Sequence, residues 1–333
     1  MKIHIVSAYP DPEPIATFRA MAAMDSVGRH QTVDAPELAD IILFVENSHY
    51  HDDRTFHRLI RHPLVRRYRE KCMMYNEHDN PWCVLPGVYC SMPVRYFTRT
   101  RLRAGPYVKT VNPYIDRIAA SEADPDLLYS FVGARNVPVR DRVLELPSEN
   151  AVIKDTTQFK PHEVTAAEGQ AAFQFYADVL TRSRFVLCPR GAGTSSFRLF
   201  ETMQAARVPV ILADQWAPPE GPDWESFAVR IPEADVASTP SLLAAYSTER
   251  WQEMRASARA AWETWFGPDV LFDYIAEGCC DILRSRRVPE RYARFVPHPA
   301  YVNLRAHLVL EPVLRRLRPL RRRIQQRSLA QRS

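Results

Sequence analysis

Hydrophobic residues recur along the first third of the chain in short runs separated by polar, turn-forming stretches. Apolar runs of about four to eight residues predict buried strands, whereas a three-to-four-residue spacing predicts helices. The runs that predict strands are Lys2–Ala8, Ala39–Glu46 and Cys72–Asn76. Asp52–Arg69 carries a helical pattern that Pro63 interrupts. Val84–Ala120 is rich in Pro, Tyr and Arg and has no clear period.

A second series of the same kind begins near Leu127. Its predicted strands are Leu127–Val132, Phe185–Leu187, Val208–Ala213 and Phe227–Ile231. Its predicted helices begin at Arg140–Leu146 and continue with Ala166–Arg182, Ser196–Ala206 and Trp251–Trp265. Alternating strands and helices build parallel sheets covered by helices. The sequence therefore predicts an α/β protein of two doubly wound, Rossmann-like domains that face a cleft.

The two series also set the expected domain boundaries. We expect an N-terminal domain at residues 1–120, a second domain at 121–285 and a C-terminal extension at 286–333. A length of 333 residues suits two domains, and 46% hydrophobic residues is ordinary for a globular protein. No apolar run approaches the roughly 18 residues of a membrane helix, and the first residues lack the apolar core of a signal peptide. We therefore expect a cytoplasmic protein.

Positive charge is concentrated at the C-terminus. Residues 312–333 hold eight arginines and no acid, so the formal net charge of +5 for the whole chain becomes −3 for residues 1–311. A mildly acidic body argues against a nucleic-acid partner. The apolar residues of one helical stripe in the tail are Leu310, Val313, Leu314, Leu317 and Ile324. This pattern predicts that residues 308–333 form an amphipathic helix that binds an anionic membrane surface, which would be the inner face of the cell membrane. The alternative is a disordered basic tail. Within these residues, Pro312 suits a helix start and Pro319 predicts a kink or an end.

The segment with the clearest chemistry runs from a predicted strand through a glycine-containing loop into a helix. Ligands bind at the carboxyl ends of strands in doubly wound sheets, and a helix N-terminus favours a diphosphate. Gly191 and Gly193 allow a close backbone approach in this loop. The helix has three candidates for its N-cap, which are Thr194, Ser195 and Ser196.

Arg198 and Glu201 lie on one face of this helix, three residues apart. A cation in the first turn opposes the helix dipole, so Arg198 is expected to face an anion. An arginine for phosphate and a carboxylate for ribose hydroxyls suit a nucleotide diphosphate-sugar. On spacing alone, a surface ion pair between Arg198 and Glu201 is the favoured alternative.

Several motifs occur in an order that resembles the exostosin family of glycosyltransferases. They are L-Y-S-F-V-G from Leu128, S-R-F-V-L-C-P-R-G from Ser183, S-F-R-L-F-E-T-M-Q from Ser196 and D-W-E-S-F from Asp223, the last followed by the acid Glu233. The resemblance covers about Leu127–Glu233. There are two departures. Ala192 stands where the family often has a basic residue, and Ala217–Pro222 replaces the usual L-P-F before D-W.

The resemblance implies a GT-B fold in which the second domain binds the donor and the first binds the acceptor. It implies an inverting, metal-independent transfer from a nucleotide diphosphate-sugar, with a UDP-sugar expected, to a glycan or lipid-linked acceptor in polysaccharide or glycoconjugate synthesis, without any other cofactor. Arg198 and Glu201 would hold the diphosphate and the nucleoside. Further residues at the donor site would be Gly133, Arg135, Arg140, Arg190, Gly191 and Ser196.

An inverting transferase needs a general base beside the acceptor hydroxyl. Glu77, His78 and Asp79 follow a predicted strand of the first domain and are candidates. A solvated turn carboxylate or a hydrogen-bonded histidine is the alternative for each of them.

No metal site is expected. Asp124-Pro125-Asp126 has the D-x-D pattern of another glycosyltransferase fold, but it precedes a strand instead of ending one. His49–Asp53 offers imidazole and carboxylate groups without an evident third site. The six cysteines contain no C-x-x-C pair and are expected to be buried thiols.

Two other functions remain open at this point. A GT-B enzyme with another donor, such as a fucosyltransferase that uses a guanosine nucleotide, would share these features. A catalytically inactive nucleotide-sugar-binding subunit is the alternative from a different class, because Ala192 and the lack of a clear base weaken the case for catalysis.

Overall fold

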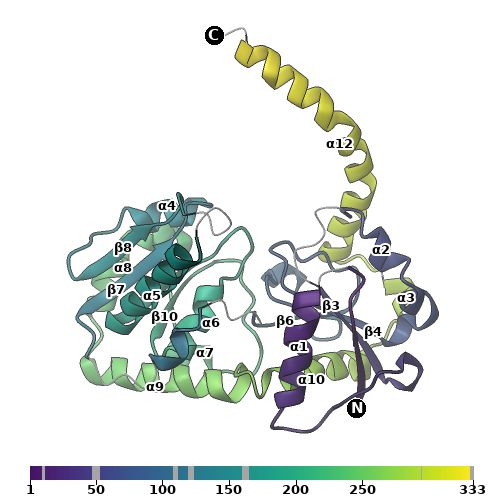
Figure 1. Ribbon diagram of the computed structural model, residues 1–333, viewed down its shortest axis with the longest axis horizontal. Coiled ribbons are helices and arrows are strands. Elements are labelled where there is room, and N and C mark those ends of the chain that lie inside the picture. Colours follow the sequence, from purple (N-terminus) through teal and green to yellow (C-terminus); the bar gives the residue numbers. More distant parts are fainter. Residues whose placement is uncertain are drawn as a thin grey trace.

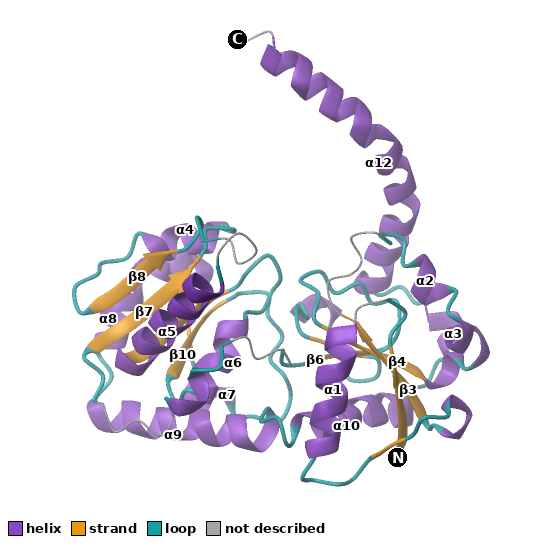
Figure 2. Cartoon of the chain, in the orientation of Figure 1, coloured by secondary structure: helices purple, strands orange, loops and turns teal. Residues whose placement is uncertain are grey.

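A computed structural model describes residues 1–9, 12–46, 53–107, 112–118, 124–159, 165–293 and 295–330, with the backbone alone for Pro12 and for 315–330. Its strands form two fully parallel sheets (Figure 2). The first sheet has the order β2-β1-β3-β4-β5-β6 and the second the order β11-β10-β9-β7-β8. Two helix-covered parallel sheets confirm the predicted α/β architecture of two doubly wound domains, which is the arrangement that the GT-B resemblance implied.

The first sheet is formed by β1 (Lys2–Val6), β2 (Gln31–Thr32), β3 (Ile41–Glu46), β4 (Cys72–Asn76), β5 (Gly87–Tyr89) and β6 (Leu102–Ala104). Strand β3 is buried along its whole length, which explains its unbroken apolar run. Its residues alternate between the two faces. Leu43 packs with the helices α1 (Pro12–Met24) and α10 (Leu271–Ser285), whereas Phe44 packs in the opposite layer.

That opposite layer contains α2 (His57–Ile60), α3 (Pro63–Arg67) and the start of α12 (Pro299–Ala330). The short helix α11 (Glu290–Ala293) packs on the turn Arg69–Lys71. The predicted helix at 52–69 is thus two short helices, because Pro63 begins the second one. In the stretch without a clear period, β5 and β6 each have three residues. Strands that short carry too little pattern to be recognised.

The second sheet is formed by β7 (Leu127–Gly133), β8 (Ala151–Asp155), β9 (Ser183–Pro189), β10 (Val208–Leu212) and β11 (Val229–Arg230). The surrounding helices are α4 (Pro138–Leu144), α5 (Ala166–Arg182), α6 (Phe197–Gln204), α7 (Trp224–Phe227), α8 (Thr239–Ala244) and α9 (Thr248–Trp265). Strand β9 again alternates. Val186 packs with α5 and α6 on one face, and Leu187 packs with α4 and α9 on the other.

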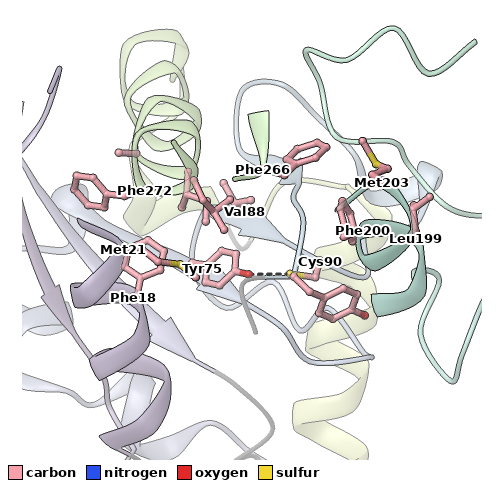
Figure 3. Close-up of a cluster of buried hydrophobic side chains, with 14 of the residues drawn as sticks. Phe18, Met21, Tyr75, Val88, Cys90, Leu199, Phe200, Met203, Phe266 and Phe272 are labelled. Carbon is pink, nitrogen blue, oxygen red and sulfur yellow. Dashed lines mark hydrogen bonds between the residues drawn. The ribbon is translucent and has the colours of Figure 1, made fainter. Parts of the chain in front are cut away.

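The two domains share one buried hydrophobic cluster (Figure 3). Phe18 and Tyr75 of the first domain stack with ring centroids 5.6 Å apart, and Phe18 also meets Phe272 of α10. Farther along the cluster, Phe200 of α6 meets Phe266 edge-to-face at 5.3 Å. Helix α10 follows the second domain in sequence but packs on the first sheet and on α1 (Figure 1). The chain therefore crosses back to the first domain before residue 285, where we had placed the end of the second one.

Backbone hydrogen bonds also join the domains directly. The Val94 N–H donates to the Gln215 carbonyl at 2.8 Å, and the Ala217 N–H donates to the Met92 carbonyl at 2.9 Å. The second bond involves Ala217, the first residue of the unusual Ala217–Pro222 segment. Near its end, Glu220 forms ion pairs with Arg99 and Arg103 of the first domain. This departure from the exostosin pattern therefore lies in a segment that bridges the domains.

Helix α12 begins inside the first domain and then leaves the body of the molecule (Figure 1). Tyr301 and Leu304 are buried in the first domain, whereas Val309 is 70% exposed. The helix continues through both Pro312 and Pro319 to Ala330, so the expectation of a start at Pro312 is wrong. Its first turns precede Pro312 because packing against the first domain stabilises them. Among the residues described here, no helix is both long enough and apolar enough to span a bilayer.

Candidate donor site

The loops at the carboxyl ends of the strands of both sheets meet around a cavity of about 620 Å³. From the first domain, Asp79 and Trp82 follow β4, and Arg95 follows β5. From the second domain, the lining residues include Arg190 and Thr194 after β9. The predicted acceptor-side loop and the predicted donor-side loop therefore face the same space.

Two arginines flank the aromatic ring of Phe131 in β7. The guanidinium carbon of Arg198 lies 4.7 Å from the ring centroid, and that of Arg140 lies 5.8 Å from it. Burial lowers the pKa of Arg140 to about 10, and the positive charge of Arg198 contributes to this fall. Neither arginine forms an ion pair with a carboxylate in the described part of the chain. The site therefore holds two partly buried cations that form no direct ion pair with a described carboxylate, which favours an anionic ligand.

The side chain of Arg198 is fixed by the end of β7. Its Nη2 donates to the Val132 carbonyl, whereas its Nε has no hydrogen-bond partner among the described residues. A Cβ added to Gly133 would lie 2.9 Å from Nη2 of Arg198 and 2.7 Å from Cζ of Phe131. Glycine at position 133 thus makes room for the guanidinium of Arg198. This is a more specific role than the direct ligand contact that the sequence suggested.

The loop before α6 contains hydroxyls without partners. Ser196 occupies the N-cap position with an extended backbone, but its side chain makes no capping bond. The hydroxyl oxygens of Thr194 and Ser195 are buried and have no hydrogen-bond partner within the described ranges. Buried hydroxyls are normally hydrogen-bonded, so this group of free donors and acceptors at a helix N-terminus suits a polar ligand.

Glu201 does not form the surface ion pair that the spacing allowed. It is half-buried, and its Oε2 accepts a 2.9 Å hydrogen bond from the hydroxyl of Tyr176 in α5. Burial raises the pKa of Glu201, while the charge of Arg198 and the Tyr176 bond oppose that rise. The carboxylate is therefore oriented by α5 and electrostatically coupled to Arg198.

Arg190 and Arg135 differ from Arg140 and Arg198 because each of them forms an ion pair with a carboxylate. Nε of Arg190 lies 2.9 Å from Oε1 of Glu233, the acid that follows the D-W motif. Arg135 is exposed and forms ion pairs with Asp155 at 2.9 Å and Asp141 at 3.3 Å. The structure thus leaves Arg135 with a compensated charge at the surface, whereas Arg190 and Glu233 together line the cavity.

The loop between β9 and α6, residues 190–196, is called the donor loop below. Its two glycines have different surroundings. A Cβ on Gly191 would come no closer than 3.4 Å to Nη2 of Arg140, so this position has room. A Cβ on Gly193 would lie 2.2 Å from Oγ of Ser91 and 2.8 Å from the carbonyl oxygen of Asp79. Gly193 therefore permits the direct contact between the donor loop and the first domain.

The three candidate bases lie in the loop after β4, which contacts the donor loop, but they differ in their hydrogen-bond partners. Oε1 of Glu77 accepts a 2.9 Å bond from the buried hydroxyl of Tyr75, and the imidazole Nδ1 of His78 contacts the backbone of Asn80. Asp79 is exposed and lines the cavity together with Arg190. Of the three, Asp79 is the residue that lines the cavity.

Sequence reasoning missed one titratable residue at this edge of the first sheet. Glu46 ends β3 with 2% exposure, and its two oxygens accept bonds from the Ala8 N–H at 2.7 Å and from the Ser7 hydroxyl at 2.9 Å. Burial raises the pKa of Glu46 to about 7. An acid at the end of the apolar run from Ile41 to Val45 was the available signal.

The metal motifs considered from the sequence do not combine with this site. Asp126 of the D-x-D pattern precedes β7 and forms a surface ion pair with Arg182. Of the 49–53 segment, only Asp53 falls within the described residues, and it accepts bonds from Tyr9 and from the backbone of α2. The six cysteines are buried and form no disulfide.

Several known proteins are similar to this chain in sequence or in structure. A family model described as the exostosin GT47 domain matches residues 46–246. An exostosin-1 homolog of Caenorhabditis elegans is 40% identical over 103 residues, which cover 30% of this chain and 27% of that protein. Exostosin-1 of Drosophila melanogaster is 33% identical over 94 residues, covering 28% of this chain and 12% of that protein. The matches thus span less than a third of the relatives' length. Among solved structures, the glycosyltransferase WaaG, involved in lipopolysaccharide biosynthesis, aligns with 83% of this chain and 99% of its own at 13% identity and a TM-score of 0.37.

Proposed function

Because this chain belongs to the exostosin GT47 family of glycosyltransferases, we propose that it transfers a sugar from a nucleotide diphosphate-sugar to a hydroxyl of a glycan or lipid-linked saccharide. The expected donor is a UDP-sugar, and the expected product belongs to a polysaccharide or glycoconjugate. The nucleotide binds the second domain, and the acceptor binds the first.

The observation that carries this proposal is the pair of arginines around Phe131. Arg140 and Arg198 have no carboxylate partner in the ranges described, and they lie at the base of the loop that contains the free hydroxyls of Thr194 and Ser195. The diphosphate would bind there, and Glu201 would accept the ribose hydroxyls. From this position the sugar reaches the 620 Å³ cavity, which Thr194 and Asp79 line from opposite domains.

The reaction that fits this arrangement is a direct displacement. The acceptor oxygen attacks the anomeric carbon, the bond from that carbon to the diphosphate oxygen breaks, and the configuration inverts. The acceptor proton passes to a carboxylate, for which Asp79 is the best-placed candidate because it lines the cavity. The departing diphosphate carries developing negative charge, which Arg140 and Arg198 stabilise without a metal ion.

Calorimetric titration with UDP tests the donor site. Glu201→Ala should weaken binding about 30- to 1000-fold, because charge-assisted bonds to two ribose hydroxyls are lost. Arg198→Ala should weaken UDP binding more than uridine binding. Arg135→Ala is the matched control, since Asp155 and Asp141 already compensate its charge. Unchanged UDP affinity in Glu201→Ala, with Arg135→Ala as affected as Arg198→Ala, would overturn the proposed site.

A panel of nucleotide sugars separates this function from its alternatives. Thermal stabilisation by a guanosine nucleotide instead of a uridine nucleotide would indicate a fucosyltransferase-type donor. Binding without transfer or donor hydrolysis would indicate an inactive binding subunit. Ala192 is exposed on the cavity wall and supplies no charge there, so a smaller contribution to phosphate binding is expected from this position.

We also propose that residues 308–333 bind an anionic membrane surface. Val309, Leu310, Val313 and Leu314 are all at least 47% exposed on α12, which leaves the body of the molecule (Figure 1). Eight arginines follow in residues 312–333, and each contributes about 1 kcal/mol near an anionic surface.

Vesicle sedimentation tests the membrane proposal. Full-length protein should sediment with phosphatidylserine-containing vesicles and not with phosphatidylcholine vesicles. A protein that ends at Glu311 should lose this binding and keep its UDP affinity. If the shortened protein sediments as well as the full-length protein does, residues 312–333 are not the membrane-binding segment.

A further inference from the structure

A cluster of side chains that could bind a metal ion lies on the first domain, apart from the candidate donor site. It joins His30, which precedes β2, to Glu277 and Cys280 of α10. One nitrogen of His30, one carboxylate oxygen of Glu277 and the sulfur of Cys280 all lie within 4.8 Å of one another. Nε2 of His30 is 3.1 Å from Oε2 of Glu277, and Nδ1 is 3.9 Å from Sγ of Cys280.

The fold brings these residues together from opposite ends of the sequence. His30 and Glu277 are 247 positions apart. On α10, Asp273, Glu277 and Cys280 are spaced so that they share one helical face. The parallel pairing of β2 with β1 fixes the segment at His30 against that face. Oδ1 of Asp273 is 3.7 Å from Nε2 of His30 and extends the group to a fourth residue.

The side chains are held in a state that suits ligation. The imidazole of His30 is 2% exposed, and its two nitrogens face Glu277 and Cys280. Arg284 donates to Oε1 of Glu277 at 2.6 Å, which leaves Oε2 directed at His30. Arg29 holds the carboxylate of Asp273 in the same way. Metal-binding carboxylates are typically anchored by such outer hydrogen bonds.

We propose that His30, Glu277 and Cys280 bind a zinc ion, with Asp273 or water in the fourth position. Zinc prefers this mixture of imidazole, thiolate and carboxylate ligands in a tetrahedral arrangement. Ligand atoms around such an ion are about 3.5 Å apart, and one ligand atom from each of the three residues already lies within 4.8 Å of the others, so shifts of roughly 1 Å are sufficient. On binding, a zinc–sulfur bond forms and the thiol proton of Cys280 passes to solvent.

A zinc ion at this site would stabilise the fold by joining α10 to the first sheet. Helix α10 contributes Phe272 to the interdomain cluster, while His30 belongs to the edge of the first sheet. A metal between them fixes the crossover helix to the first domain and therefore stabilises the arrangement of both domains. This role is independent of sugar transfer, so its test does not depend on the donor or on activity.

Cobalt substitution gives the sharpest test. Full-length protein is treated with a chelator, desalted and titrated with Co²⁺ while its absorption spectrum is recorded. A thiolate-to-cobalt charge-transfer band and the ligand-field bands of tetrahedral Co²⁺ should appear, and added Zn²⁺ should abolish both. Zn²⁺ should also raise the unfolding temperature of the chelator-treated protein.

Cys279→Ser is the matched control, because Cys279 is an adjacent buried thiol outside the group. It should keep the cobalt bands, whereas Cys280→Ser should lose the charge-transfer band. His30→Gln should lose the stabilisation by Zn²⁺ and provides a second variant if Cys280→Ser folds poorly. Absence of the bands in the wild-type protein, or equal bands in Cys280→Ser and Cys279→Ser, would show that the group is a hydrogen-bonded cluster only.

Discussion

The hydroxyl of Tyr176 in α5 donates a 2.9 Å hydrogen bond to Oε2 of Glu201 in α6. This bond orients the carboxylate proposed to bind the donor ribose, and it makes Tyr176 a positioning residue. Tyr176→Phe should weaken UDP binding about 5- to 30-fold, because it removes one hydrogen bond to a charged group.

The pH dependence of UDP binding distinguishes this role from a general structural one. The Tyr176 bond opposes the rise in the pKa of Glu201, so its removal should raise that pKa further. On acidification, Tyr176→Phe should therefore lose affinity at a higher pH than the wild-type protein. Tyr274→Phe, which removes a 2.9 Å hydroxyl bond to the Glu220 carbonyl, should not alter the profile. An identical pH profile for Tyr176→Phe and the wild-type protein would contradict the positioning role.

A second prediction concerns Arg207, which is 0% exposed and caps two helix ends. Its guanidinium donates to the carbonyls of Leu180 at 3.1 Å, Thr181 at 2.7 Å, Ala205 at 3.2 Å and Ala206 at 3.0 Å. Arg207→Met would leave these acceptors without a donor and should lower the free energy of unfolding by about 3 kcal/mol or more.

Arg182→Met is the control for this measurement. Arg182 pairs with Asp126 at the surface, so its loss should cost roughly 0–1 kcal/mol. Denaturant unfolding of both variants compares the two costs. Equal costs for the buried and the surface arginine would contradict the assigned role of Arg207.

The two glycines of the donor loop should respond differently to substitution by alanine. In Gly193→Ala, the new Cβ would overlap with Ser91, so the loop must move away from the first domain. We expect a loss of about 1–3 kcal/mol in stability, together with reduced transfer activity. Gly191→Ala meets nothing closer than 3.4 Å and should unfold at the wild-type temperature. Thermal unfolding of the pair measures the difference, and a larger loss in Gly191→Ala would show that the loop is packed differently.

Glu46 predicts a specific effect of pH on stability. Burial raises its pKa in the folded protein to about 7 from an ordinary value of 4.5, so the unfolded chain loses the proton first as the pH rises. The folded state is therefore favoured below pH 4.5 by this group, and the advantage is lost between about pH 4.5 and 7. Across this window the free energy of unfolding should fall by up to about 3 kcal/mol.

Glu46→Gln should abolish that fall. The amide oxygen can accept from the Ala8 N–H, while the amide nitrogen donates to Ser7 Oγ, whose proton can then bond the Tyr9 carbonyl. The variant should match the wild-type protein at pH 4.5 and be more stable at pH 8. Denaturant unfolding at both values provides the comparison, and a constant difference between the two proteins would exclude Glu46 as the cause.

A fifth prediction concerns the transfer reaction itself. Because the described D-x-D residues lie before β7, away from the donor loop, initial transfer rates should not require manganese. A chelator should leave the rate unchanged at temperatures well below unfolding. Removal of zinc from the proposed site on α10 would change thermal stability instead of the transfer rate. Cys280→Ser therefore separates an effect of the chelator on stability from an effect on catalysis. A rate lost with chelator and restored by Mn²⁺ in this variant would contradict metal-independent transfer.

Local patterns in the sequence were sufficient for the regular elements and for the donor loop. The apolar run within Ala39–Glu46 predicted a buried strand, which is β3, and the helix at Ala166–Arg182 has the predicted bounds. These features depend on hydrogen bonds and burial within a few residues of each position. The order strand, glycine loop, helix likewise placed Arg198 and Glu201 at a sheet's carboxyl edge.

Other assignments required contacts between residues far apart in the sequence. The sequence placed both Arg135 and Arg198 at the donor site, but only the fold pairs Arg135 with Asp155 and sets Arg198 against Phe131. Whether an arginine is compensated depends on which strands are neighbours, and β7 lies between β8 and β9 by topology alone.

The amino-acid sequence by itself thus determined the family, the alternation of strands and helices, and the position of the glycine-containing loop proposed to bind the donor, because each of these is encoded in local patterns. The tertiary structure decided which charges are paired, which glycine touches the other domain, and that His30 meets Cys280 across nearly the whole chain. The contact between His30 and Cys280 arises when α10 returns to the first domain, and no local pattern specifies where a returning helix will pack.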